Sequence, residues 1–249
     1  MPRRFAQAAR CFSGTFISAH RAMSISLPTL SVAEIVQRRL GAPLTDDANA
    51  LAAVAMVDST RAREMKLRSW IPPRLLRRFD RGFARSNTIQ PSTARALYAI
   101  TRALNPEVVA ETGTYWGYST AVLAAALRDE KRGTIHTFDL YKHAGQHIPM
   151  ELMPWVRMYR GRPATAAMPE VLSAAAPTLF FQDSVHDYDG VLAELQVARP
   201  FLAPRAVVLF HDFIVDGVRR AAVDGLPGYE VALVDVDDPQ QLGIAIAPR

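Results

Sequence analysis

The amino-acid sequence predicts an α/β protein with a doubly wound, Rossmann-like and mostly parallel sheet, helices on both faces and helices before it. Three observations support this fold class. From residue 91 onward, strand and helix patterns alternate, which is typical of parallel sheets. One strand pattern ends in a glycine-containing turn that opens a helix. At 249 residues the chain is long enough for one such domain with an N-terminal extension.

Seven strands and five helices are expected in this part of the chain. The strands are predicted at 107–112, 133–139, 155–160, 177–183, 205–212, 228–235 and 241–247. The helices are predicted at 91–104, 117–129, 164–175, 187–202 and 214–224. The last two strands are separated only by a short turn containing Asp237-Asp238-Pro239, so they are predicted to form a C-terminal hairpin.

The N-terminal region has a different character. Residues 1–25 are free of acids and contain arginine and serine, which fits a disordered tail, a mitochondrial-type presequence, or a true start at Met23. Residues 26–90 are predicted to be a helical, basic extension. In it, Ser31-Val-Ala-Glu34 is a capping box, Gly41 ends the first short helix, and Thr45-Asp-Asp starts a longer one.

Charge and composition exclude several classes of protein. The net charge is +5, and residues 61–85 hold nine basic side chains against two acids. Such a segment is either a solvated helix face, a contact with an acidic partner subunit in a homodimer, or a contact with an anionic partner such as a nucleic acid. No apolar run reaches the roughly 18 residues of a membrane span. A single cysteine, Cys11, excludes an intramolecular disulfide and a cysteine-based zinc cluster.

The segment Val108–Thr120 carries the first functional motif, with Glu111, Gly113, Gly117 and Ser119 within nine residues. A strand that breaks into a glycine turn and then opens a helix directs free backbone N–H groups and the positive end of the helix dipole at one point. The turn therefore suits an anionic or polar ligand. The spacing E-x-G-x-x-x-G-x-S differs from the G-x-G-x-x-G of dinucleotide-binding proteins, which disfavours an NAD-dependent oxidoreductase.

Two further groups of polar residues follow at predicted strand ends. Asp139 ends the second strand, about twenty residues beyond the glycine turn, where a carboxylate can accept both hydroxyls of a ribose. Asp183 and His186 follow a buried strand, and His211 and Asp212 end the next one. Because ligands of parallel sheets bind beyond the carboxyl ends of the strands, these four side chains are expected to meet there. Carboxylates and imidazoles gathered in this way need pairing, hydration or a metal ion.

The segment Glu111-Thr-Gly-Thr-Tyr-Trp-Gly-Tyr-Ser119 resembles motif I of the class I S-adenosylmethionine (SAM) methyltransferases, especially the catechol and caffeoyl-CoA O-methyltransferase branch. The resemblance implies that Gly113 and its neighbours, including Tyr115 and Gly117, bind the cofactor near its methionine part. It further implies that Ser119 helps to hold the carboxylate of SAM. Glu111 would lie beneath, contacting the ligand or ordering the loop.

The arrangement D-x-x-H-x-Y at residues 183–188, followed by Phe210-His211-Asp212, resembles the metal-dependent O-methyltransferases, including the macrolide-sugar and cephalosporin-type enzymes. By this resemblance Asp183, His211 and Asp212 are metal ligands and His186 is the general base. The resemblance covers residues 90–249 and implies that the final strand enters the sheet antiparallel. His211 departs from the family pattern, which has a carboxylate there. An imidazole favours Mn²⁺, Fe²⁺ or Zn²⁺ over the Mg²⁺ that oxygen ligands prefer, unless His211 contacts substrate without a metal.

Together these motifs predict a SAM-binding domain over residues 91–249 that methylates a hydroxyl of a small molecule with the help of Mg²⁺ or Mn²⁺. Two alternatives stay open: a nucleic-acid methyltransferase guided by the basic segment, although no base-pocket motif is present, and a non-catalytic SAM-binding protein. The expected location is the cytoplasm, with mitochondrial targeting by the N-terminal arginines as the alternative.

Overall fold

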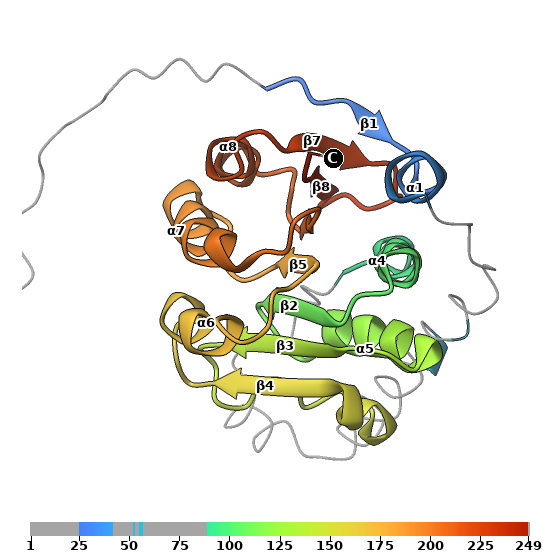
Figure 1. Cartoon of the computed structure of the whole chain (residues 1–249), viewed down its shortest axis with the longest axis vertical. Coiled ribbons are helices and arrows are strands. Elements are labelled where there is room, and N and C mark those ends of the chain that lie inside the picture. Colours follow the sequence, from blue (N-terminus) through green and yellow to red (C-terminus); the bar gives the residue numbers. More distant parts are fainter. Residues whose placement is uncertain (1–24, 42–51, 53–54, 57–88, 249) are drawn as a thin grey trace, which may run out of the picture.

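An eight-stranded mixed sheet forms the centre of the computed structural model, which describes residues 25–41, 52, 55–56 and 89–248 (Figure 1). Along the sheet the order is β1-β7-β8-β6-β5-β2-β3-β4. The strands are β1 Thr29–Leu30, β2 Val108–Thr112, β3 Thr134–Asp139, β4 Val156–Arg160, β5 Leu179–Gln182, β6 Val207–Phe210, β7 Glu230–Val234 and β8 Leu242–Ile246. Strands β2 to β6 pair in parallel, whereas β8 lies antiparallel between β6 and β7.

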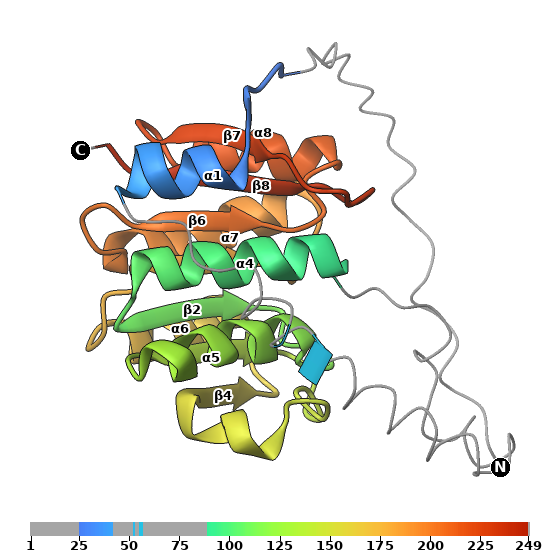
Figure 2. The same ribbon diagram turned by 90° about the vertical axis from the view of Figure 1, so that its right-hand side faces the viewer.

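Helices cover both faces of this sheet. One layer contains α1 Val32–Glu34 with the π-helical turn η1 Ile35–Leu40, α4 Pro91–Leu104 and α5 Tyr118–Glu130. The other contains α6 Ala164–Leu172, α7 Tyr188–Ala198 and α8 Asp216–Gly225. Figure 1 shows the two layers on opposite sides of the sheet, and Figure 2 shows α1, α4 and α5 lying across its front. Short 3₁₀ segments, η2 Met150–Trp155 and η3 Arg199–Phe201, precede β4 and follow α7.

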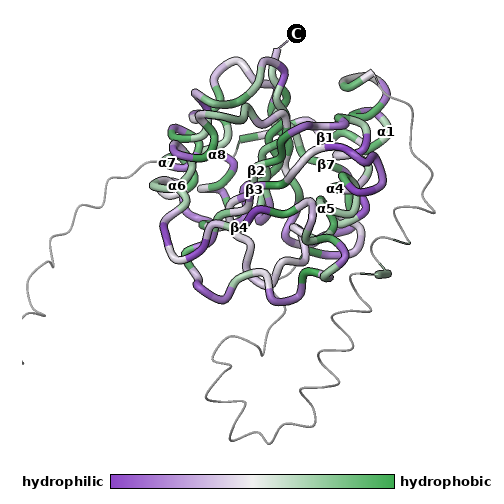
Figure 3. The backbone as a smooth tube through the Cα atoms, turned by 60° about the horizontal axis from the view of Figure 1, so that its bottom comes forward, coloured by the Kyte–Doolittle hydropathy of each residue, from purple (hydrophilic) through white to green (hydrophobic). Residues whose placement is uncertain are grey.

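The central strands are buried along their whole length because helices pack on both of their faces. Every residue of β5 and of β6 is buried. Continuous apolar strands of this kind are characteristic of covered parallel sheets. In Figure 3 the hydrophobic segments run through the middle of the molecule, where the strands lie. A sheet covered in this way exposes its carboxyl edge, so that edge is where polar side chains can gather.

The predicted seven strands and five helices of residues 91–247 are all present. The doubly wound fold class is therefore confirmed, and so is the antiparallel entry of the last strand. The prediction of seven strands was too low by one. Thr29 and Leu30 pair in parallel with Leu233 and Val234 and form β1 at the edge of the sheet. A strand of two residues is too short to show an alternating pattern, so the sequence did not reveal it.

The capping box predicted at Ser31 is confirmed. Ser31 Oγ accepts the backbone N–H of Glu34 at 3.2 Å, and the Glu34 carboxylate accepts the backbone N–H of Ser31 at 3.0 Å. Gly41 then ends η1 in the left-handed conformation, as expected. Ile35 of η1 is fully buried and belongs to the same apolar cluster as α4 and α5. The predicted domain boundary at residue 90 stays a prediction. Residues 29–40 lie before this boundary and yet pack on the sheet domain that follows it.

Three features of the N-terminal region fall outside the described residues. They are the tail before residue 25, the basic segment 61–85, and the helix expected to start at Thr45 apart from residues 52, 55 and 56, which are helical. Among the residues that the structure describes, none of the helices combines the length and apolar character required to cross a bilayer.

Candidate active site

The turn between β2 and α5 is held in shape by three residues with positive φ: Gly113 at +91°, Tyr115 at +44° and Gly117 at +89°. Gly113 is required by space as well as by conformation. A Cβ placed on it would lie 2.0 Å from the carbonyl oxygen of Asp183, whose backbone N–H donates to the carbonyl of Thr112 at 2.9 Å. The first motif and Asp183, which directly follows β5, are therefore packed against each other.

Glu111 lies beneath the turn and organises it. Its side chain is fully buried and accepts hydrogen bonds from Ser119 at 2.7 Å, Thr137 at 2.6 Å and Thr120. Burial raises the pKa of this carboxyl to about 7, against the opposing effect of the three hydroxyl donors. Of the two roles expected for Glu111, this geometry favours ordering the loop. Ser119, expected near the cofactor carboxylate, directs its hydroxyl to Glu111 in this structure.

Asp139 ends β3 directly beside the turn. One carboxylate oxygen accepts the backbone N–H of Tyr115 at 2.6 Å, and the other accepts the backbone N–H of Tyr141 at 2.6 Å. A carboxylate has about four lone-pair positions, so two remain for a ligand. The structure thus brings Asp139 and the glycine turn together, as the sequence predicted.

Asp183, His186, His211 and Asp212 form one cluster at the carboxyl ends of β5 and β6. His186 Nε2 lies 3.0 Å from Asp212 Oδ2 and 3.7 Å from Asp183 Oδ1. His211 Nδ1 lies 3.1 Å from the same Asp183 oxygen and 3.3 Å from the same Asp212 oxygen. Each of the two carboxylate oxygens is therefore close to both imidazoles. The convergence expected from the strand ends is present in the structure.

The two histidines differ in accessibility. The His186 side chain is 42% exposed, whereas that of His211 is 2% exposed. One donor atom each from Asp183, His186 and Asp212 lies within 4.8 Å of the others, a spacing that suits a shared metal ion. The family resemblance implies His211 rather than His186 in that set. In the structure His186 faces the cavity and His211 supports the carboxylates from behind.

The charges of this cluster are strongly coupled. Hydrogen bonds to Asp183 and Asp212 raise the pKa of His186 to about 9, against a smaller effect of burial. Burial lowers the pKa of His211, but the same two carboxylates outweigh it and raise the value to about 10. Burial would raise the pKa of Asp212, yet His186 and His211 hold it well below its usual range. Without a metal ion, both imidazoles are therefore cationic at neutral pH.

The sequence does not indicate the backbone conformation of Asp212 or the residues that hold Asp212 and His211 in place. Asp212 has a φ of +49°, which is uncommon for a residue other than glycine. Its Oδ1 accepts the side-chain amide of Gln240 at 2.8 Å. The side chain of Asp238 faces His211 from the same turn, with Oδ2 3.7 Å from His211 Nε2. Asp238 and Gln240 lie in the turn between β7 and β8, for which the sequence predicted a turn but no contact with the site.

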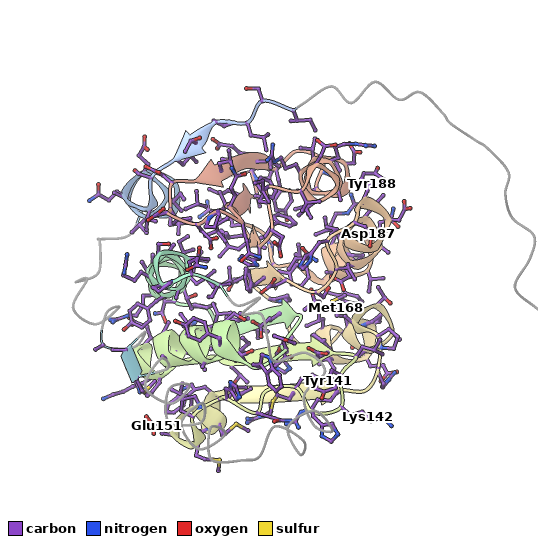
Figure 4. The ribbon with its side chains drawn as sticks, turned by 180° about the vertical axis from the view of Figure 1, so that it is seen from behind. Tyr141, Lys142, Glu151, Met168, Asp187 and Tyr188 are labelled. Atoms are coloured by element: carbon purple, nitrogen blue, oxygen red, sulfur yellow. The ribbon has the colours of Figure 1, made fainter. Side chains whose placement is uncertain are left out.

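A cavity of about 650 Å³ joins these parts of the site. Gly113, Tyr115 and Asp139 line one part of it, and Asp183, His186 and Asp212 line another. In Figure 4 the loop after β3, with Tyr141 and Lys142, lies below the start of α7, with Asp187 and Tyr188. A second, much smaller pocket of about 20 Å³ lies over the turn and is lined by Gly113 and Ser119 among others.

The sequence of residues 110–213 matches a family model described as a methyltransferase domain. The matched segment contains Glu111, Gly113 and Asp139, and also the whole cluster around Asp183 and Asp212. These residues are therefore similar in sequence to a methyltransferase domain. No curated protein matches this sequence significantly.

Solved structures of methyltransferases share the fold. The O-methyltransferase TomG from Streptomyces achromogenes, in complex with SAM, has a TM-score of 0.55 at 16% identity, covering 87% of this chain and 96% of TomG. The methyltransferase PaMTH1 from Podospora anserina, bound to S-adenosylhomocysteine (SAH), has a TM-score of 0.54 at 14% identity, covering 88% and 94%. An O-methyltransferase from Bacillus cereus in complex with SAH has a TM-score of 0.51 at 15% identity, covering 76% and 99%.

Proposed function

We propose that this protein is a SAM-dependent methyltransferase, which transfers the methyl group of SAM to a hydroxyl group of a small molecule. The observation that carries the proposal is the shared cavity: Asp183, His186 and Asp212 line the same space as Gly113 and Asp139. A methyl donor held at the turn and at Asp139 would therefore lie beside a cluster that can bind and deprotonate an acceptor. The O-methyltransferases TomG and the Bacillus cereus protein, which share this fold, agree with that reaction.

The cofactor end of the cavity suits SAM. Asp139 has carboxylate lone pairs to spare for a ribose diol. Gly113, Tyr115 and Gly117 would surround the methionine part, and Ser119 would reach the carboxylate of SAM by leaving Glu111. The N-terminus of α5 lies at this turn, where its dipole favours a negatively charged group.

The other end of the cavity suits a divalent cation. Asp183 and Asp212 supply hard oxygen donors that converge on one point together with His186. We assign the metal to the two carboxylates and give His211 a supporting role, because it is buried behind them and does not line the cavity. When bound there, Mg²⁺ or Mn²⁺ would lower the pKa of the acceptor hydroxyl and weaken the attraction that keeps His186 protonated.

His186 then takes the proton of the acceptor hydroxyl. It is the imidazole of this cluster that reaches the cavity, and its Nε2 faces both carboxylates. An imidazole freed of its carboxylate partners titrates near pH 6.5, which suits a base at neutral pH. The chain's remaining task is to hold donor and acceptor in line, which can supply a large share of the rate.

The test is to incubate the protein with methyl-labelled SAM and a metabolite extract and to detect labelled products by mass spectrometry. We expect a labelled O-methyl product with Mn²⁺ or Mg²⁺ and its loss in EDTA. His186→Ala should lower the rate by about 10²–10⁴-fold, the usual contribution of a general base. It should leave SAM binding, and Mn²⁺ binding measured by calorimetry, intact.

Two results would contradict parts of this assignment. A His186→Ala protein with undiminished methyl transfer would exclude His186 as the base. A variant that loses Mn²⁺ binding would show that His186 is a metal ligand instead. The exposed His143 in the loop after β3 provides a matched control, because His143→Ala removes an imidazole without touching the cluster.

A further inference from the structure

The His211 ring has carboxylates on both of its nitrogens' sides. Asp183 and Asp212, which line the cavity, lie near Nδ1, and Asp238, which does not line it, lies near Nε2. His211 Nδ1 donates to Asp183 Oδ1 at 3.1 Å and lies 3.3 Å from Asp212 Oδ2. Its Nε2 is buried, has no hydrogen-bond partner among the described residues, and lies 3.7 Å from Asp238 Oδ2. The imidazole thus bridges the site to a third acid that the cavity does not reach.

Asp238 is itself fully enclosed and fixed from two directions. Its side chain is 0% exposed. Oδ2 accepts the hydroxyl of Thr93 at 2.5 Å, and Oδ1 accepts the backbone N–H of Gln240 at 2.9 Å. The first donor comes from α4 and the second from the β7–β8 turn, so the carboxylate cannot turn away from His211 without losing both. An enclosed carboxylate next to an unpartnered ring nitrogen is costly unless the two interact.

The same turn also holds the other member of the His211–Asp212 pair. The side-chain amide of Gln240 donates to Asp212 Oδ1 at 2.8 Å, and the backbone carbonyls of Gln241 and Gln240 accept the N–H groups of Phe213 and Ile214. The β7–β8 turn therefore contacts the segment after β6 at the imidazole, at the carboxylate and along the backbone. Residues 238–241 act as one support for this part of the site.

We propose that Asp238 is a positioning residue of the active site: it fixes the His211 ring so that Nδ1 faces Asp183 and Asp212. Without Asp238 the ring would lose the carboxylate that faces Nε2 and could tilt or rotate away from Asp183 and Asp212. Asp183 and Asp212 would then lose the donor that orients them toward the cavity. The catalytic consequence rests on the function proposed above, whereas the orientation of the ring can be measured without it.

The experiment compares Asp238→Asn with Asp237→Asn, which removes an exposed acid from the same turn. Long-range ¹H–¹⁵N spectra of the histidine rings report the environment of both His211 nitrogens. We expect the His211 signals to move in Asp238→Asn and to stay in place in Asp237→Asn. Mn²⁺ affinity should fall about 10–100-fold in Asp238→Asn only, as is usual when a supporting partner of a metal site is removed. SAM affinity should change less than twofold in both variants.

Thr93→Val separates this role from a merely structural one. It removes a donor to the Asp238 carboxylate but keeps the carboxylate, so melting temperature should fall while the His211 signals persist. If Mn²⁺ does not bind the unmodified protein, the metal part of the proposed function fails, and the ring spectra alone decide the role of Asp238. Unchanged His211 signals in folded Asp238→Asn would overturn the proposal.

A protein that fails to fold with Asp238→Asn does not end the test. In the unmodified protein we expect an exchange-protected proton on Nε2 of His211, because that nitrogen is buried and faces a carboxylate. A His211 ring without a proton on Nε2 would exclude donation to Asp238 and would overturn the proposal in the same way.

Discussion

Gly113 and Asp183 are in direct backbone contact, so the cofactor turn and the reaction cluster form a single unit. A Cβ on Gly113 would come within 2.0 Å of the Asp183 carbonyl oxygen and 2.8 Å of the Ser184 nitrogen. Backbone atoms cannot move aside as a flexible side chain can. The missing side chain of Gly113 therefore lets the turn after β2 pack against the segment after β5, and it also leaves room for a ligand. A substitution at this position should affect both.

Gly113→Ala should destabilise the protein and weaken SAM binding together. Gly228→Ala is the matched control, because Gly228 also has a positive φ, of +87°, but a Cβ added to it would meet nothing within 4 Å. We expect the control to cost about 1–2 kcal/mol for the left-handed backbone alone. Gly113→Ala should cost about 1–3 kcal/mol more because of the overlap. Denaturant unfolding and SAM calorimetry measure both effects, and equal losses in the two variants would refute the contact.

Asp139→Ala should weaken the binding of SAM and of SAH alike. The variant loses the acceptor for two backbone N–H groups and the proposed acceptor for the ribose. Lost hydrogen bonds to a charged group are worth about 1–3 kcal/mol, so affinity should fall about 5–150-fold. Calorimetry with both ligands is the measurement, with the exposed Asp235→Ala as control. Normal affinity in Asp139→Ala would place ribose recognition elsewhere.

Mn²⁺ affinity should rise as the pH is raised from 6 to 9. In the metal-free protein the pKa of His186 is raised to about 9 by Asp183 and Asp212, so a metal ion on these carboxylates displaces a proton. Calorimetric titrations in two buffers with different protonation enthalpies count the released protons. His186→Ala should flatten the pH dependence. An affinity independent of pH in the unmodified protein would contradict the coupling.

The same histidines should make the metal-free protein less stable at alkaline pH. The folded-state pKa values of His186 and His211 are raised to about 9 and about 10, above the ordinary 6.5. Their contribution to the free energy of unfolding is therefore complete below about pH 6.5 and is lost as pH rises through the folded values. Melting temperatures between pH 6 and 10 should fall, and saturating Mn²⁺ should reduce the fall by occupying the carboxylates.

Glu111→Gln should flatten the pH dependence of stability between pH 5 and 7. The pKa of Glu111 is raised from 4.5 to about 7 when the protein folds, so the folded state binds the extra proton in this range. Its contribution to the free energy of unfolding consequently declines as pH rises from 4.5 to 7. An uncharged amide has no such dependence. Thermal unfolding at several pH values tests this, with Glu151→Gln, which changes an exposed acid, as the control. If stability changes with pH equally in the unmodified protein and in both variants, Glu111 does not have a raised pKa.

The position of the site at the carboxyl edge was predictable from local patterns. Asp139, Asp183 and Asp212 each lie at or near the end of a predicted strand, and in a parallel sheet the ends of such strands meet at one edge. The order of the strands did not have to be known for this inference. The expectation that Glu111 lies beneath the glycine turn came from the resemblance to motif I, and its buried hydrogen bonds to Ser119 and Thr120 agree with it. Periodicity and strand direction therefore determine which acids share the site.

The tertiary structure decided which histidine faces the cavity and which supports it. His186 and His211 both follow strand ends, and their spacing from the acids does not show that one is 42% exposed and the other 2% exposed. The β7–β8 turn places Asp238 beside His211 and Gln240 against Asp212, whereas His186 lines the cavity. Likewise, Thr29 and Leu30 are identified as a strand only by their pairing with β7. Such contacts join residues far apart in the chain, and burial depends on what packs over a residue, so no local pattern records them.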